Sequence, residues 1–118
     1  MGHSVKIVKA VIPEGEALSQ PIHMADFVQG IVIMPDVWTD ANLGIQVGAE
    51  PDDCGPMTDK SDAYSTDVNI AGVAGGRHPL PDYIFSAVWI RLWSHDGDGN
   101  DADQAAEREL TLMLKSSA

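Results

Sequence analysis

Cysteine, aromatic residues and long apolar runs are all scarce in this chain of 118 residues. The single cysteine, Cys54, cannot form a disulfide within the chain, so the fold must depend on apolar burial and backbone pairing. Aromatic residues make up only 6% of the sequence, which predicts an aliphatic core. No apolar run approaches the roughly 18 residues of a membrane span, and the first residues lack a secretory signal. We therefore expect a protein made in soluble form, with no membrane partner.

Basic residues are also few. Seven lysines and arginines stand against 18 aspartates and glutamates, which gives a formal net charge of −11. Each nucleic-acid phosphate that a protein neutralises needs a lysine or arginine, so we expect no nucleic-acid partner. The hydrophobic fraction of 44% is ordinary for a globular protein, and the length suits one domain spanning residues 1–118.

Motifs that carry catalysis are missing as well. The serines have no nearby histidine and aspartate pattern, and Cys54 has no basic neighbour in the sequence to lower its pKa. Neither a His-x-x-x-His pair nor a glycine-rich phosphate loop occurs. We assign no catalytic residue and expect a protein that is not an enzyme.

Strand patterns are what the chain does contain, and residues 27–50 are central to them. Residues 43–47 alternate apolar with polar or small side chains, which is typical of a strand with one buried face. Residues 31–34 are continuously apolar, which predicts a strand covered on both sides. Between the two strands lies a polar corner, where we expect Trp38 to be a buried anchor.

Short strands separated by turns recur along the rest of the chain. Lys6 and Lys9 are compatible with a first strand at a sheet edge, although the favoured interpretation is that they are ordinary solvated charges. Pro21 limits the second strand to an edge or a bulge. Such strands bury one face each by stacking two sheets, so the expected fold is all-β, an antiparallel sandwich or jelly roll. Strands are predicted at residues 5–12, 18–24, 28–34, 43–47, 64–70, 87–94 and 109–115, a short helix at 103–110, turns at 72–81 and an irregular connection at 49–63.

One acidic stretch has the spacing of a calcium loop. With Asp96 at the first position, Asp98 and Asn100 fall on the third and fifth and Glu107 on the twelfth, all with hard oxygen ligands. However, Asp101 takes the position where the calcium loop needs glycine, and the preceding segment is a strand rather than a helix. These departures favour the alternative of a solvated acidic hairpin loop. Calcium is the candidate cofactor, and otherwise we expect none.

A second candidate site is formed by Trp89, Arg91 and Trp93, which share one face of a strand whose other face is already apolar. Tryptophan and arginine are enriched at binding hot spots, so these residues predict a contact with another protein. The alternative is that a second layer or the N-terminal strand covers them within the chain.

Several short motifs resemble those of a group of small proteins encoded among the virion structural genes of tailed bacteriophages. The likeness runs from about Leu18 to Leu114. The chain departs from the pattern at residues 96–103, at Trp93 and at residues 54–59. The matching motifs are Gly30-Ile31, Met34-Pro35, Trp38-Thr39-Asp40-Ala41-Asn42-Leu43, Gln46, Gln104-Ala105-Ala106-Glu107-Arg108 and Leu110-Thr111-Leu112.

This resemblance implies a β-rich virion component, made in the cytoplasm of the host bacterium. Its expected function is capsid decoration or cement on the outside of the head, through contacts with the major capsid protein or other virion proteins and as a homo-oligomer. The alternative function is a carbohydrate-binding module on a tail or head appendage, because exposed tryptophans on jelly rolls commonly stack against sugars.

Overall fold

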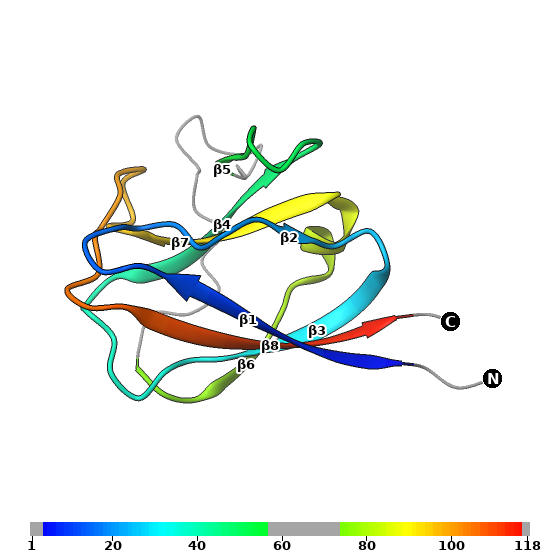
Figure 1. Cartoon of the computed structure of the whole chain (residues 1–118), viewed down its shortest axis with the longest axis horizontal. Coiled ribbons are helices and arrows are strands. Elements are labelled where there is room, and N and C mark those ends of the chain that lie inside the picture. The colour runs from blue at the N-terminus through cyan, green and yellow to red at the C-terminus, as the bar shows by residue number, and fades with distance from the viewer. Residues whose placement is uncertain (1–3, 57–73, 117–118) are drawn as a thin grey trace.

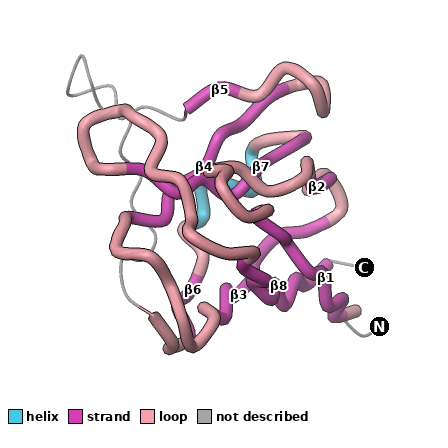
Figure 2. The backbone as a smooth tube through the Cα atoms, turned by 60° about the vertical axis from the view of Figure 1, so that its left-hand side comes forward, coloured by secondary structure: helices cyan, strands magenta, loops and turns pink. Residues whose placement is uncertain are grey.

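Eight strands form two antiparallel sheets of four strands each, stacked face to face, in the part of the chain that the structure describes (Figure 1). The structure is a computed structural model, and it describes residues 4–56 and 74–116. Figure 2 shows the two sheets as separate layers. The first sheet has the order β1 (Val5–Ile12), β8 (Arg108–Ser116), β3 (Phe27–Ile33) and β6 (Arg77–Pro79), and the second β2 (Ile22–His23), β7 (Trp89–His95), β4 (Asn42–Gly48) and β5 (Gly55–Pro56).

The strands pair in a regular scheme. β1 pairs with β8, β2 with β7, β3 with β6 and β4 with β5. The pairs of β8 with β3 and of β7 with β4 complete the two sheets. A long hairpin wrapped in this way, with successive pairs in alternate sheets, is a jelly roll. The predicted antiparallel sandwich of jelly-roll type is therefore confirmed.

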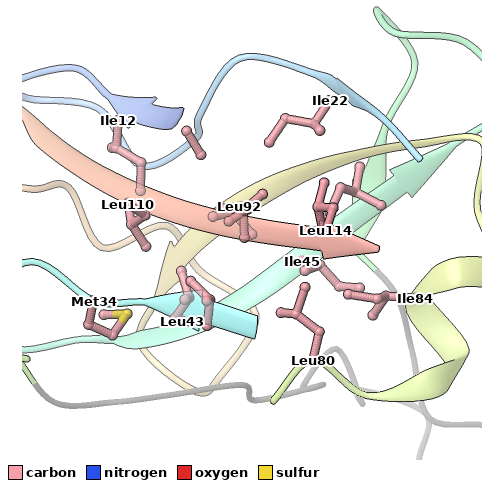
Figure 3. Close-up of a cluster of buried hydrophobic side chains, with 14 of the residues drawn as sticks. Ile12, Ile22, Met34, Leu43, Ile45, Leu80, Ile84, Leu92, Leu110 and Leu114 are labelled. Carbon is pink, nitrogen blue, oxygen red and sulfur yellow. The ribbon is translucent and has the colours of Figure 1, made fainter. Parts of the chain in front are cut away.

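An aliphatic core lies between the sheets (Figure 3). Because side chains alternate along a strand, β8 turns three leucines inward, and their exposed fraction is zero. A short 3-10 helix, η1 (Asp82–Ser86), adds Ile84 to the same cluster. Trp38 is buried at the rim, and its indole Nε1 donates a hydrogen bond to the carbonyl oxygen of Ala41, 3.0 Å away. The predictions of an aliphatic core and of Trp38 as an anchor are confirmed.

Most predicted strands are present, but several expectations need correction. The segment 18–24 contributes only β2, at an edge, and an isolated bridge between Leu18 and Trp93. Residues 72–81 were expected to form turns, yet they include β6, which is an edge strand and so tolerates Pro79. The segment 49–63 likewise includes β5. The predicted strand at 64–70 lies outside the described residues.

The helix predicted at residues 103–110 is wrong. The backbone of Gln104 is extended and pairs with the turn after β1, because Gly15 N donates to Gln104 O and Gln104 N donates to Glu16 O. The strand β8 then begins at Arg108. A helix of two turns is marginal alone, so these tertiary hydrogen bonds outweigh its local propensity.

The strand β3 was expected to be covered on both faces, and this is also wrong. Val32 is fully buried, but Ile31 keeps 39% of its surface exposed. The reason is that β3 lies inside a sheet whose outer face is open to solvent. Alternate residues of the apolar run therefore face the core and the solvent.

We expect Leu112→Ala to lower the free energy of unfolding by about 3 kcal/mol, because it removes a fully buried side chain from the middle of β8. Its neighbour Met113, 36% exposed on the other face, is the matched control: Met113→Ala should cost less than about 1 kcal/mol. Urea denaturation of both variants measures the difference. Equal losses would contradict the assignment of faces on β8.

Candidate functional site

The side chain of Trp93 lies on the outer face of the second sheet but is covered by other parts of the chain. It lies on β7 opposite Gly44 of β4, so its ring meets no competing side chain on that strand. Its indole Nε1 donates to Asp101 Oδ1 at 2.7 Å, and its ring stacks on His95 at 4.5 Å between centroids. Only 1% of Trp93 is exposed. In the free chain Trp93 is therefore an internal anchor for the acidic loop and has no side-chain surface to offer a partner.

The other two residues of the predicted contact surface are half-buried. The Arg91 Nε atom donates to the carbonyl oxygen of Ser19 at 2.7 Å, which ties the segment after β1 to the edge of the sheet. Trp89 meets His23 edge to face, with 4.9 Å between ring centroids. A partner surface on this face would thus depend on Trp89 and Arg91, and a contact there stays a prediction.

A hollow of about 330 Å³ lies beside Arg91. Its walls come from the turn after β1 and from the start of the segment that leads to β8, with Glu16, Asp101 and Asp103 among them. The carboxylates bring negative charge next to one guanidinium that is already hydrogen-bonded to Ser19. The hollow is therefore a polar crevice between segments rather than an apolar ligand pocket.

The acidic loop after β7 closes on the Asp96 carboxylate. Asp96 Oδ1 accepts hydrogen bonds from the backbone nitrogens of Asp98, at 2.7 Å, and Asn100, at 3.2 Å, and Oδ2 accepts one from the Asn100 side-chain amide at 3.1 Å. Gly97 and Gly99 adopt positive φ angles of 91° and 87°, which a residue with a Cβ rarely adopts. The donors hold the pKa of Asp96 below its ordinary value, with the backbone N–H of Asp98 as the largest cause and the Asn100 amide next.

These contacts bear on the predicted calcium loop of Asp96, Asp98, Asn100 and Glu107. The loop is closed by its own hydrogen bonds, which occupy both oxygens of the Asp96 carboxylate. Within residues 4–56 and 74–116, no group of three or more histidine, cysteine, aspartate or glutamate side chains is placed to hold a metal ion. Calcium binding by these four residues stays a prediction.

A buried hydrogen-bond cluster around Gln104 joins three parts of the chain. Gln104 Oε1 accepts from Thr39 N at 2.9 Å and from Arg108 Nε at 3.1 Å, and its Nε2 donates to Ser94 Oγ at 2.9 Å. Thr39 Oγ1 accepts from Arg108 Nη2 at 3.1 Å and from the backbone nitrogen of Ala105 at 3.0 Å. The cluster thus fastens the corner between β3 and β4 to the end of β7 and the start of β8.

The two most distinctive motifs of the phage resemblance meet in this cluster. Thr39 belongs to the Trp38 motif, and Gln104 and Arg108 belong to the later one. The Gln104 side chain bonds the backbone of Thr39, and the Arg108 side chain bonds Thr39 Oγ1, although the partners lie 65 or more positions apart. These motifs therefore hold the fold together, and they give no information about a partner surface.

The open outer face of the first sheet is a candidate surface that sequence reasoning missed. The strand register places Ile7, Met113, Ile31 and Pro79 in one row across all four strands. The first three side chains are 52%, 36% and 39% exposed. We call these four residues the apolar row. Finding it requires the register between strands far apart in the sequence, although the apolar run at 31–34 was one local signal.

Charged residues flank the apolar row on both sides. The outward positions of the first sheet carry Lys9, Lys115 and Arg77, against one carboxylate, Glu109. The chain as a whole has 18 acidic and seven basic residues. This face is therefore positive on an otherwise strongly negative molecule, which is the kind of asymmetry that orients a protein on an acidic partner.

The fold is similar to that of a prophage protein. The crystal structure of the SPBc2 prophage-derived protein YomS matches with a TM-score of 0.63, over 98% of this chain and 96% of that one. The sequences are 7% identical, so the likeness shows the shared fold alone. No known family model and no curated protein matches the sequence. The described residues include no helix long and apolar enough to cross a membrane.

Cys54 lies immediately before β5 in a half-buried position. Its Sγ donates a weak hydrogen bond to the carbonyl oxygen of Glu50, 3.7 Å away. Burial is the largest cause that raises the pKa of the thiol, the charge of Arg91 lowers it, and Asp53 and Asp52 raise it further. Cys54 is therefore protonated at neutral pH and is a weak nucleophile.

We expect the Asp96 carboxyl to titrate below its ordinary value of 3.8. A lowered pKa in the folded state stabilises the loop above the unfolded pKa, and this contribution is lost as the pH falls through the folded pKa. Carbon-detected NMR titration measures the midpoint, and Asn100→Ala should raise it because one donor is removed. A midpoint at or above 3.8 in the unmodified chain would refute this account of the loop.

We expect Gln104→Ala to cost at least about 2 kcal/mol of unfolding free energy, because the half-buried backbone N–H and C=O of Thr39 lose their partner and the buried Ser94 Oγ loses one of its two. The matched control is Gln29→Ala, at an exposed position of β3, with an expected loss below about 0.5 kcal/mol. Chemical denaturation compares the two. If Gln104→Ala lowers the free energy of unfolding as little as the control does, the cluster does not stabilise the fold.

Proposed function

We propose that this protein is a structural component of a tailed-phage particle and binds the outside of the head as a decoration or cement protein. The observation that carries the proposal is the positive outer face of the first sheet with the apolar row at its centre. An exposed apolar centre with a charged rim is the anatomy of a protein-binding surface. The sequence motifs of phage virion proteins and the fold shared with a prophage-derived protein support the same assignment.

The mechanism is geometric rather than chemical. A rigid sandwich presents one flat sheet face, and a capsid presents the same acceptor site many times. A single contact with a Kd of about 1 μM corresponds to a binding free energy of about 8 kcal/mol. Such a contact gives high occupancy when the protein concentration exceeds the Kd. If each module bridges neighbouring capsid subunits, contacts on the two sides of a junction reinforce each other. Many such contacts would resist expansion of the shell.

The carbohydrate-binding alternative depended on Trp89 and Trp93 as an exposed pair. Trp93 is buried and bonded to Asp101, so it cannot stack against a sugar without moving out of the sheet. Trp89 is half-buried with its ring against His23. These contacts favour the protein-binding proposal, and sugar binding becomes an outcome of the experiment.

We expect the purified chain to co-sediment with heads of its phage assembled without it, at low and at moderate salt. Ile31→Glu should weaken this association at least tenfold, because it places a charge in the apolar row. Val37→Glu is the matched control, since Val37 is 64% exposed in the corner after β3 and lies outside the row. No DNA binding is expected, because of the net charge of −11.

Failure to co-sediment at both salt concentrations would reject the decoration function. If a protein that fails to co-sediment is retained on a glycan array, the result would favour the carbohydrate-binding alternative. Equal loss for Ile31→Glu and Val37→Glu would mean that the apolar row is not the contact.

A further inference from the structure

The strand β1 has one edge bonded to β8 and one edge that faces away from the sheet. Ser4 O accepts a hydrogen bond from Ser116 N at 2.9 Å, and in an antiparallel ladder the bonded residues alternate. The even-numbered residues of β1 therefore bond to β8, and the odd-numbered residues direct their backbone groups to the other edge. The same odd-numbered residues carry the outward side chains, Ile7 among them.

Part of this edge is already occupied by a side chain. Gln20 Oε1 accepts from Val11 N at 2.8 Å, and Gln20 Nε2 donates to Lys9 O at 2.7 Å. A carboxamide bonded in this way imitates one peptide unit of a neighbouring strand. A strand that pairs with the free edge of β1 can therefore extend only as far as the N–H of Lys9.

The remainder of the edge is open. The backbone N–H and C=O groups of Val5 and Ile7 and the N–H of Lys9 have no hydrogen bond to any described residue. The side chains of Val5 and Ile7 are 58% and 52% exposed. Figure 1 shows this start of β1 beside the end of β8. Unpaired backbone groups beside exposed apolar side chains are the features that recruit an added strand.

Charge indicates which strand the edge accepts. Lys6 and Lys9 lie on β1, and Lys115 of β8 is directly opposite Val5. Three of the seven basic residues of the chain are thus gathered at this corner. They repel a basic strand and attract one with carboxylate side chains.

A second copy of the chain is a poor match for the edge. Two β1 strands paired around Ile7 would need the Lys9 carbonyl oxygen, which already accepts the Gln20 amide. Pairing around Lys6 would put the two Lys6 side chains directly opposite each other, and like charges in that position are destabilising. These two symmetric registers are therefore disfavoured.

We propose that the open edge of β1, from Val5 to the N–H of Lys9, binds an extended acidic strand of a partner protein and adds it to the first sheet. The partner residue opposite Ile7 is apolar and lengthens the apolar row, the residues opposite Lys6 and Lys9 are acidic, and Gln20 marks where pairing ends. This inference rests on the proposed function, in which the partner strand belongs to a capsid protein.

Proline at Ile7 tests the edge with little change to the fold. It deletes one N–H, and that group points to solvent rather than to β8, which is where strands tolerate proline. Lys6 is already extended, the conformation preferred before proline. Ile7→Val is the matched control, because it keeps the N–H and nearly all of the apolar side chain. Melting temperatures confirm folding, and Val5→Pro applies the same logic if Ile7→Pro does not fold.

Two binding measurements separate this inference from the decoration function. One is co-sedimentation with undecorated heads. The other is fluorescence anisotropy with a labelled peptide that contains Glu-Val-Val-Glu-Val, compared with a peptide in which both glutamates are replaced by lysine. In antiparallel register the two glutamates lie opposite Lys9 and Lys6, and the middle valine lies opposite Ile7. We expect Ile7→Pro to weaken both head binding and binding of the glutamate peptide at least tenfold, while Ile7→Val stays within about twofold and the lysine peptide does not bind.

Binding of the glutamate peptide without binding to heads would keep the edge and reject the decoration function. Head binding that is indifferent to Ile7→Pro, or a glutamate peptide that does not bind, would overturn the edge proposal. Light scattering completes the test: a mass above 12.6 kDa that returns to the monomer value in Ile7→Pro would mean that a second copy takes the edge, which also overturns it.

Discussion

Burial of the inner face of β8 is the constraint on which the rest of the structure depends. This last strand lies between β1 and β3, so the first sheet has no centre without it. Leu110, Leu112 and Leu114 are fully buried against the second sheet, and their burial sets the register of both neighbouring strands. Since side chains alternate, the same register decides what β8 turns outward. The core and the apolar row are therefore two consequences of one pairing.

The strands and the fold class could be predicted from local patterns, because period-2 alternation at β4, β7 and β8 reflects burial directly. Elements decided by distant partners could not. The segment around Gln104 has good helix formers, but its hydrogen bonds go to Thr39 and to the turn after β1. The short edge strands β5 and β6 lack enough residues for any alternation. The continuous apolar run in β3 was correctly assigned to a strand, yet its outer residues face solvent and were not foreseen.

For the candidate sites, the sequence indicated which side chains share a face but not what covers that face. Trp89, Arg91 and Trp93 do lie together on β7, as alternation requires. The acidic loop and the turn after β1 then bury Trp93 and tie down Arg91, and neither contact has a local signal. The positive face of the first sheet, by contrast, could not be recognised from the sequence. Lys9, Lys115 and Arg77 are scattered in sequence and are gathered by the register alone. The chain has a net charge of −11, so this gathering gives the first sheet a charge opposite to that of the chain as a whole.

In the described residues, loops cover part of the outer face of the second sheet. The first sheet has an exposed outer face and, along β1, a free edge. In the proposed function the first sheet is the attachment surface, and a density map of the phage particle that resolves strands tests this directly. We expect this chain on the outside of the head, with its first sheet toward the capsid protein and a capsid strand beside β1. A map with the Trp89 face of the second sheet against the shell, or with the chain absent from the head, would contradict it.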